Sequence, residues 1–208
     1  AEAHILGYYI DITSTKLREV LDALKEGRKE RCAQILTRLR SLGVDIPLEY
    51  VLSLGKEGFV GRSQIFKAMV NLGFARPEKR YGDFQRYLGK KGLAYVEHHS
   101  LSPGDAVRFV RDCSGVPVLA HPRTEIPFSV IEDLISIGLE GIEAYHPTHS
   151  EETTRKWLEF AKSRGLIVTG GSDFHKATPD EPCGLGSLAI PDCVASLLTQ
   201  RWLEISSA

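Results

Sequence analysis

Three stretches in the second half of the chain decide the fold: VPVLAHP at 116–122, GIEAYHP at 141–147 and LIVTGGSDFH at 166–175. Each opens with four or five mostly apolar residues, which is typical of a short buried strand. Helix-like segments with short connections lie between them. This alternation of strand and helix implies parallel strands with crossover helices. The sequence therefore predicts an α/β fold in this half of the chain.

Capping signals define the helices around these strands. Ser102 is a good N-cap residue, and Pro103 suits the first helical position. A second helix is expected around 129–137. Ser150 begins a third helix, which Gly165 ends. These boundaries predict three helices between or before the three strands.

Side chains that can bind a metal ion or transfer a proton follow each predicted strand. His121 comes after the first strand, His146 after the second, and the pair Asp173 and His175 after the third. Because parallel strands end on one face, these side chains are expected on the same face. In (β/α) barrels that face holds the active site.

Asp173 and His175 are two residues apart, so both side chains point the same way in extended backbone. Together with His121 they predict a metal site. A mixed carboxylate and imidazole set suits Zn²⁺, Mn²⁺ or Fe²⁺ better than Mg²⁺. Such ions polarise phosphoryl oxygens and lower the pKa of bound water. The chain has neither a Gly-x-Ser-x-Gly motif nor a Walker loop, so no competing nucleophile or nucleotide motif appears.

Three further residues near these strand ends have open interpretations. His146 either contacts substrate or protonates a leaving group, or it packs as a hydrogen-bonded histidine beside Pro147. His149 follows close behind His146, and its role is left open. Glu143 either orients a ligand histidine or pairs with a cation.

The first half of the chain has a different pattern. Residues 4–12 resemble an apolar strand, whereas residues 14–92 have helical apolar stripes. The stripes predict a small helical core; they comprise Leu17, Val20, Leu21, Leu24, Ile35, Leu36, Leu39, Ile65, Phe66, Met69, Val70 and Leu72.

Composition excludes several protein classes. The chain has 208 residues, 42% of them hydrophobic, with 26 Lys and Arg against 27 Asp and Glu. Without a basic excess, any anion binding must be local. The four cysteines form no CxxC pair, so neither a zinc finger nor a disulfide framework is predicted. No apolar run suggests a membrane helix, and no signal peptide is evident, so we expect a cytoplasmic protein.

The strand-end segments resemble the PHP (polymerase and histidinol phosphatase) family of phosphoesterases. The segments that carry the resemblance are Ala3–Tyr8 (AHILGY), 119–122 (LAHP), 141–147 and 170–175. Gly61-Arg62 before a helix, and Ala94-Tyr95-Val96, resemble the branch with a helical insertion. That branch contains nucleotide and oligonucleotide phosphatases and exonucleases.

The resemblance implies a distorted (β/α)7 barrel, formed by residues 1–13 and 93–208, with residues 14–92 as the helical insertion. It implies two or three divalent metal ions (Mn, Fe or Zn). The ligands that this sequence retains are His4, His121, Asp173 and His175. Arg62 is a candidate phosphate ligand because its planar fork suits phosphate oxygens; the alternative is a structural pairing with an acidic neighbour. His146 is the candidate catalytic and substrate-binding residue.

The resemblance also has departures. The family's first strand, which bears His-x-His, and its following Asp, His and Glu ligands are absent, so the barrel is expected to be incomplete at its N-terminus. Gln64 stands where the family often has histidine. We therefore expect a metal-dependent phosphoesterase acting on phosphorylated small molecules, nucleotides or short oligonucleotides. The alternatives are a non-catalytic module that binds nucleic acid or nucleotides, and a fragment whose open edge pairs in a homo-oligomer.

Overall fold

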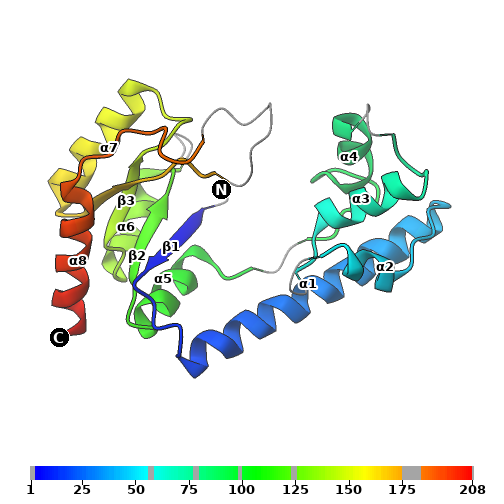
Figure 1. Ribbon diagram of the computed structural model, residues 1–208, viewed down its shortest axis with the longest axis horizontal. Coiled ribbons are helices and arrows are strands. Elements are labelled where there is room, and N and C mark those ends of the chain that lie inside the picture. Colours follow the sequence, from blue (N-terminus) through cyan, green and yellow to red (C-terminus); the bar gives the residue numbers. More distant parts are fainter. Residues whose placement is uncertain are drawn as a thin grey trace. The chain divides into compact units, whose positions relative to one another are not determined.

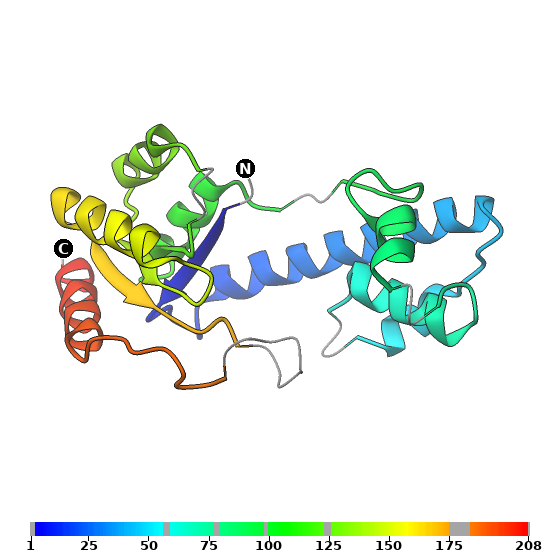
Figure 2. The same cartoon turned by 90° about the horizontal axis from the view of Figure 1, so that it is seen from above.

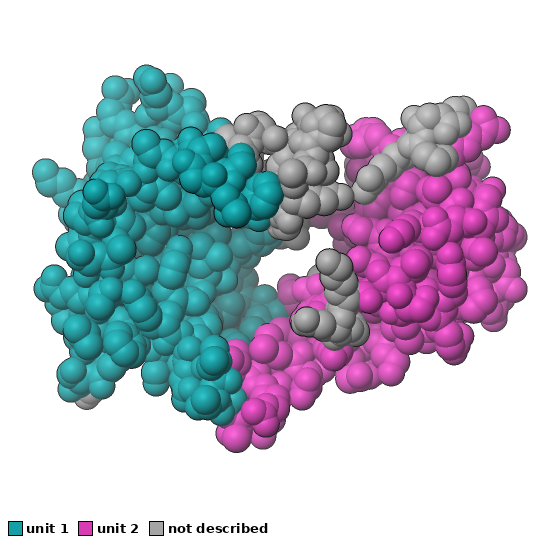
Figure 3. All heavy atoms as spheres, viewed as in Figure 1, with its two compact units in different colours: residues 1–14, 101–208 teal, residues 15–100 magenta. Residues whose placement is uncertain are grey.

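The computed structural model describes residues 3–55, 59–76, 80–97, 100–122, 126–174 and 184–207. The chain forms two compact units, shown in different colours in Figure 3. Unit 1 comprises residues 1–14 and 101–208, and unit 2 comprises residues 15–100.

Unit 1 contains a four-stranded sheet in the order β1-β2-β3-β4. The strands are β1 (His4–Tyr8), β2 (Val116–Ala120), β3 (Gly141–Tyr145) and β4 (Ile167–Gly170). Strands β2, β3 and β4 are parallel, as the sequence predicts, whereas β1 runs antiparallel to β2. The fold is therefore a mixed α/β fold with a parallel sheet. The expected first strand is shorter than its apolar run, because the chain turns at Tyr9, where φ is +55°.

In the described part of unit 1, four helices accompany this sheet: α5 (Pro103–Asp112), α6 (Phe128–Ser136), α7 (Glu151–Arg164) and α8 (Cys193–Ser206). The predicted caps are confirmed. The Ser102 hydroxyl accepts a hydrogen bond from the Asp105 amide, and the Ser150 hydroxyl accepts one from the Thr153 amide. Gly165 ends α7 in the left-handed conformation, with φ +63°.

The alternation of strand side chains separates two apolar faces of the sheet. One face packs against α5, α6 and α7 in a cluster that includes Val107, Leu119, Ile131, Leu134, Ile142, Ala144 and Trp157. The other packs against α8 in a cluster that includes Val116, Val118, Ile167 and Leu198. Helices thus cover both faces of the sheet, as Figures 1 and 2 show.

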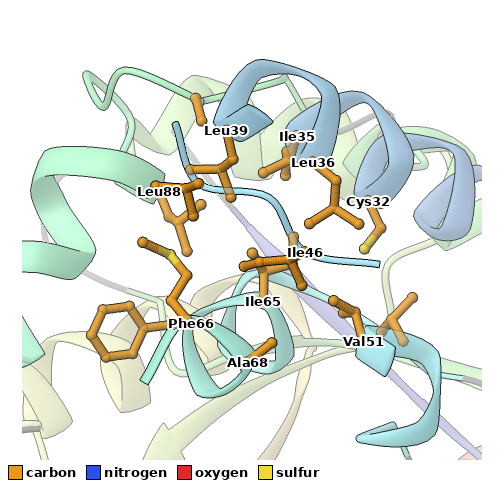
Figure 4. Packing of buried hydrophobic residues seen from close by; sticks show 14 of the residues in the cluster. Cys32, Ile35, Leu36, Leu39, Ile46, Val51, Ile65, Phe66, Ala68 and Leu88 are labelled. Atoms are coloured by element: carbon orange, nitrogen blue, oxygen red, sulfur yellow. The ribbon is translucent and has the colours of Figure 1, made fainter. Parts of the chain in front are cut away.

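Unit 2 contains the helices α1 (Thr15–Ser41), α2 (Leu48–Ser53), α3 (Arg62–Asn71) and α4 (Arg80–Leu88). Its own apolar core is shown in Figure 4 and includes Cys32, Ile35, Leu36, Leu39, Val51, Ile65, Phe66, Met69 and Leu88. Burial departs from the predicted stripes at two places. Leu72, which caps the C-terminus of α3, is 45% exposed, and Leu21, in the first half of α1, is 44% exposed.

Within the described residues, no helix combines the length and the apolar character that crossing a membrane requires.

Candidate active site

The sheet topology gathers the strand-end side chains at one edge. His121 follows β2, His146 follows β3, and Asp173 lies three residues after the end of β4. His4 is the first residue of β1, but because β1 is antiparallel, His4 pairs in register with Ala120 at the end of β2. A residue at the start of one strand therefore joins residues at the ends of the others.

Four histidine rings are neighbours at this edge. The ring centroids of His4 and His121 are 5.1 Å apart, those of His121 and His146 are 4.9 Å apart, and those of His146 and His149 are 5.5 Å apart. Three of the predicted site residues, His4, His121 and His146, are thus brought together. His175 lies outside the described residues.

The backbone at this edge is unusual. His121 and Asp173 have positive φ angles of +25° and +51°, which are uncommon for residues other than glycine. The His121 amide donates a hydrogen bond of 2.9 Å to Oε2 of Glu143. Such backbone strain is held by its surroundings and clusters at functional sites.

Glu143 is a buried acid, with 5% of its surface exposed. Burial raises the pKa of its carboxyl to about 6; the hydrogen bond from the His121 amide opposes this rise, and the negative charge of Asp173 adds to it. Asp173 is therefore close enough to both Glu143 and His146 to influence their charge states.

Backbone contacts fix opposite tautomers for two neighbouring histidines. The Thr148 amide can only donate, so Nδ1 of His146, 3.2 Å away, is the acceptor and the proton of the neutral ring is on Nε2. Nδ1 of His149 lies 2.9 Å from the Ala144 carbonyl oxygen, so it carries the proton and leaves a lone pair on Nε2. Burial, together with the charges of His121 and His149, lowers the pKa of His146 and favours its neutral form.

The donor chemistry at this edge fits a divalent transition-metal ion. Nε2 of His149 is buried, carries a lone pair and has no hydrogen-bond partner among the described residues. Nε2 of His146 is also buried without a described partner, but it carries the proton of its ring and so is a hydrogen-bond donor and not a metal ligand. Imidazole nitrogens beside a carboxylate are typical of Zn²⁺, Mn²⁺ or Fe²⁺ sites. Within the described ranges, however, no group of three or more His, Cys, Asp or Glu side chains converges on one point, and the predicted ligand His175 is not among them.

Arg62 lies in unit 2, where it lines a cavity of about 150 Å³ with two other arginines, Arg28 and Arg31. Arg62 donates from Nη1 to the Leu88 carbonyl at 3.0 Å, and Arg31 donates from Nε to the Val96 carbonyl at 2.9 Å. Burial lowers the pKa of Arg31, and the positive charges of Arg62 and Arg28 lower it further.

These three arginines have no carboxylate partner among the described residues, so the expected pairing of Arg62 with an acidic neighbour is not seen there. Arg62 is a candidate from the sequence, whereas Arg28 and Arg31 join it only in the structure. Their spacing of three residues on α1 is the signal that could have indicated a shared face.

Gln64 has a structural contact. Its Oε1 accepts a hydrogen bond of 3.0 Å from the Gly61 amide and so caps the first turn of α3. This contact accounts for a glutamine at that position.

Comparisons with known proteins point to one class of enzymes. No family model matches the sequence. The chain is 30% identical over 181 residues to phosphoribosyl 1,2-cyclic phosphate 1,2-diphosphodiesterase of Eggerthella lenta, covering 84% of this chain and 66% of that protein. It is 31% identical over 178 residues to 3',5'-nucleoside bisphosphate phosphatase of Chromobacterium violaceum, covering 83% of this chain and 62% of that protein. It is 27% identical over 183 residues to 5'-3' exoribonuclease Rnm of Escherichia coli, covering 86% of this chain and 62% of that protein.

Two solved structures share the fold. A protein from Bifidobacterium adolescentis, designated a metal-dependent phosphoesterase, has a TM-score of 0.79 and 27% identity, covering 97% of this chain and 72% of that one. An amidohydrolase structure from Chromobacterium violaceum, with bound sulfate and no metal, has a TM-score of 0.73 and 27% identity. The match covers 96% of this chain and 72% of that one. The chain therefore spans about two thirds of the length of the proteins it matches.

Proposed function

The chain belongs to the PHP-type metal-dependent phosphoesterases, and from this membership we propose that it hydrolyses phosphate esters of nucleotides or short oligonucleotides with water activated at a divalent metal centre. The observation that carries the proposal is the grouping of His4, His121 and His146 at one edge of the sheet, with Asp173 nearby. The three curated relatives are enzymes acting on nucleotide-related phosphoesters or RNA, which supports the substrate class.

The proposal extends to the architecture. The four strands of unit 1 would form part of a distorted (β/α)7 barrel, and unit 2 would be its helical insertion. The similarity to the Bifidobacterium structure over 97% of this chain supports this assignment. In such a barrel the strand-end edge of unit 1 corresponds to the face that carries active sites.

The metal ligands would be His4, His121, Asp173 and His175, holding two or three Mn, Fe or Zn ions. When bound, such ions polarise a phosphoryl oxygen and lower the pKa of water towards neutrality. His121 and Asp173 would present their side chains from strained backbone, which limits their freedom before any ion binds.

His146 would contact the substrate. Its Nε2–H is a buried donor with no described partner, so it can donate a hydrogen bond to a phosphate oxygen or to the leaving-group oxygen. Because its neutral form is favoured, this donation adds no positive charge beside the metal ions.

The arginine cavity of unit 2 would bind an anion such as phosphate. Positive charge comes from the three arginines of this cavity, Arg28, Arg31 and Arg62, which have no carboxylate partner among the described residues. One guanidinium group can donate two parallel hydrogen bonds to two oxygens of a phosphate. The sulfate in the Chromobacterium structure supports anion binding in a protein of this fold.

Asp173→Asn tests the proposal directly. We expect metal-dependent turnover of a nucleoside bisphosphate to fall by at least about 100-fold, because the substitution removes a ligand charge. The control is Asp133→Asn, an exposed aspartate on α6, which is expected to keep wild-type turnover. Undiminished activity of Asp173→Asn would contradict the proposal, and nucleotide binding without turnover in the wild type would favour a non-catalytic binding module.

A further inference from the structure

Glu143 is a buried carboxylate that is not among the proposed metal ligands. It lies in the middle of β3 and is 5% exposed. No lysine or arginine in the described part of the chain forms an ion pair with it. A buried charge without a cation is costly, so its position requires another compensating contact.

The first such contact is with the loop that follows β2. Oε2 of Glu143 accepts the 2.9 Å hydrogen bond from the His121 amide. His121 has a φ of +25°, a conformation that persists only when the surrounding structure holds it. A charged acceptor makes this hydrogen bond stronger than one between neutral groups. Glu143 therefore restrains His121 through its backbone.

The second contact is with the loop that follows β4. A Cβ atom placed on Gly171 would lie 3.0 Å from Oε1 of Glu143, so glycine leaves the space that this oxygen occupies. The Gly171 amide also donates a 3.0 Å hydrogen bond to the Tyr145 carbonyl, which fixes this loop beside β3. Asp173 lies two residues further along the same loop.

We infer that Glu143 is a positioning residue, which sets the spacing between His121 and the loop of Asp173 by contacting both with one carboxylate. This inference rests on the proposed function, because it assumes that both residues bind a metal ion. It resolves the two interpretations of Glu143 in favour of orienting a ligand histidine. Preorganised ligands bind a metal ion more tightly than ligands that must first be ordered.

Glu143→Ala and Glu143→Gln are the informative pair of variants. In the metal-free chain, hydrogen exchange of the His121 amide, followed by NMR, is expected to be faster in Glu143→Ala and close to wild type in Glu143→Gln. The glutamine oxygen can still accept the amide hydrogen bond. For Zn²⁺, measured by calorimetry, we expect Glu143→Ala to bind about 10- to 100-fold more weakly, with recovery to within about threefold in Glu143→Gln.

One further variant is a control, and another tests the contact between Glu143 and the loop of Gly171. Glu140→Gln changes an acid that pairs with Arg201 at 2.8 Å, and it should alter neither readout. Gly171→Ala introduces the Cβ atom that crowds Oε1, and it should weaken Zn²⁺ binding by less than Glu143→Ala does. Circular dichroism of each variant checks that it folds; if Glu143→Ala does not fold, Glu143→Gln and Gly171→Ala still test the inference.

Unchanged His121 amide exchange in Glu143→Ala would overturn the inference, as would Zn²⁺ affinity within twofold of wild type. Equal losses in Glu143→Gln and Glu143→Ala would also overturn it, because the hydrogen bond would then not be the cause. If the wild type binds no Zn²⁺, the proposed function fails, whereas the exchange of the His121 amide still tests the restraint on this loop.

Discussion

The two units differ in the charge of the side chains that their candidate sites bring together. In unit 1 the strand-end edge combines histidines with the acids Glu143 and Asp173, a set that attracts cations. In unit 2 the cavity of Arg28, Arg31 and Arg62 has positive charge and no carboxylate partner among the described residues, a set that attracts anions. The first set suits the metal ions that a metal-dependent phosphoesterase uses, and the second suits phosphate groups.

The largest expected effect tests whether each unit depends on its own core. Trp157 is completely buried in unit 1, and its Nε1 donates to the Pro122 carbonyl at 3.0 Å, directly after His121. Trp157→Ala should cost about 3–5 kcal/mol of the stability of unit 1. Hydrogen exchange measured by mass spectrometry should increase across residues 101–122 and 141–170 and stay unchanged in unit 2. An equal increase in unit 2 would show that the two cores do not act separately.

The next effect concerns the anion site. Arg31→Met keeps most of the side-chain volume and removes the charge, so we expect binding of pyrophosphate, measured by calorimetry, to weaken by about tenfold or more. Arg40→Met is the control, because Arg40 is exposed and pairs with Asp45 at 2.8 Å. Neither variant should change Zn²⁺ binding. Loss of pyrophosphate binding in both variants, or in neither, would contradict the assignment of the cavity.

These two sites were not equally visible in the sequence. The positions of His121, His146 and Asp173 at one edge of the sheet could be predicted, because each follows an apolar strand and the strand ends of a parallel sheet share one edge. The participation of His4 could not be derived from parallel strands, because it depends on the antiparallel pairing of β1. Arg28 and Arg31 were missed because charged residues on a helix usually face solvent.

Burial was also only partly predictable. The stripe of Ile35, Leu36 and Leu39 is buried as expected, whereas Leu21 on the same helix is exposed. Helical spacing identifies one side of a helix, but only the packing partner determines how far along the helix that side is covered. The core of unit 2 ends on α1 at Cys32.

A smaller effect concerns the tautomers of two histidines. We expect ¹⁵N NMR of the metal-free chain to show a proton on Nε2 of His146 and on Nδ1 of His149, because backbone groups fix both rings. Thr148→Val removes the hydroxyl 2.9 Å from Nδ1 of His146 but keeps the backbone amide, so the tautomer should be retained. The reverse tautomer at His146 would remove the donor proposed for the substrate.

The smallest effect concerns Cys32, which lines the arginine cavity. Burial raises the pKa of its thiol from 9.0 to about 11, so the thiol stays protonated in the folded chain. Burying this thiol in its neutral form therefore contributes stability below pH 9, and that contribution is lost as the pH rises from 9 towards 11. Alkylation at pH 8, followed by mass spectrometry, should modify the exposed Cys193 well before Cys32. Rapid modification of Cys32 would show that the core around the cavity opens readily.

The metal content of the purified 208-residue chain tests the central claim most directly. After equilibration with Mn²⁺, Fe²⁺ or Zn²⁺ and removal of excess metal, elemental analysis should find at least about one ion per chain in the wild type and a clear loss in Asp173→Asn. Absence of bound metal in the wild type, or equal content in both proteins, would contradict a metal centre at the edge formed by His4, His121 and Asp173.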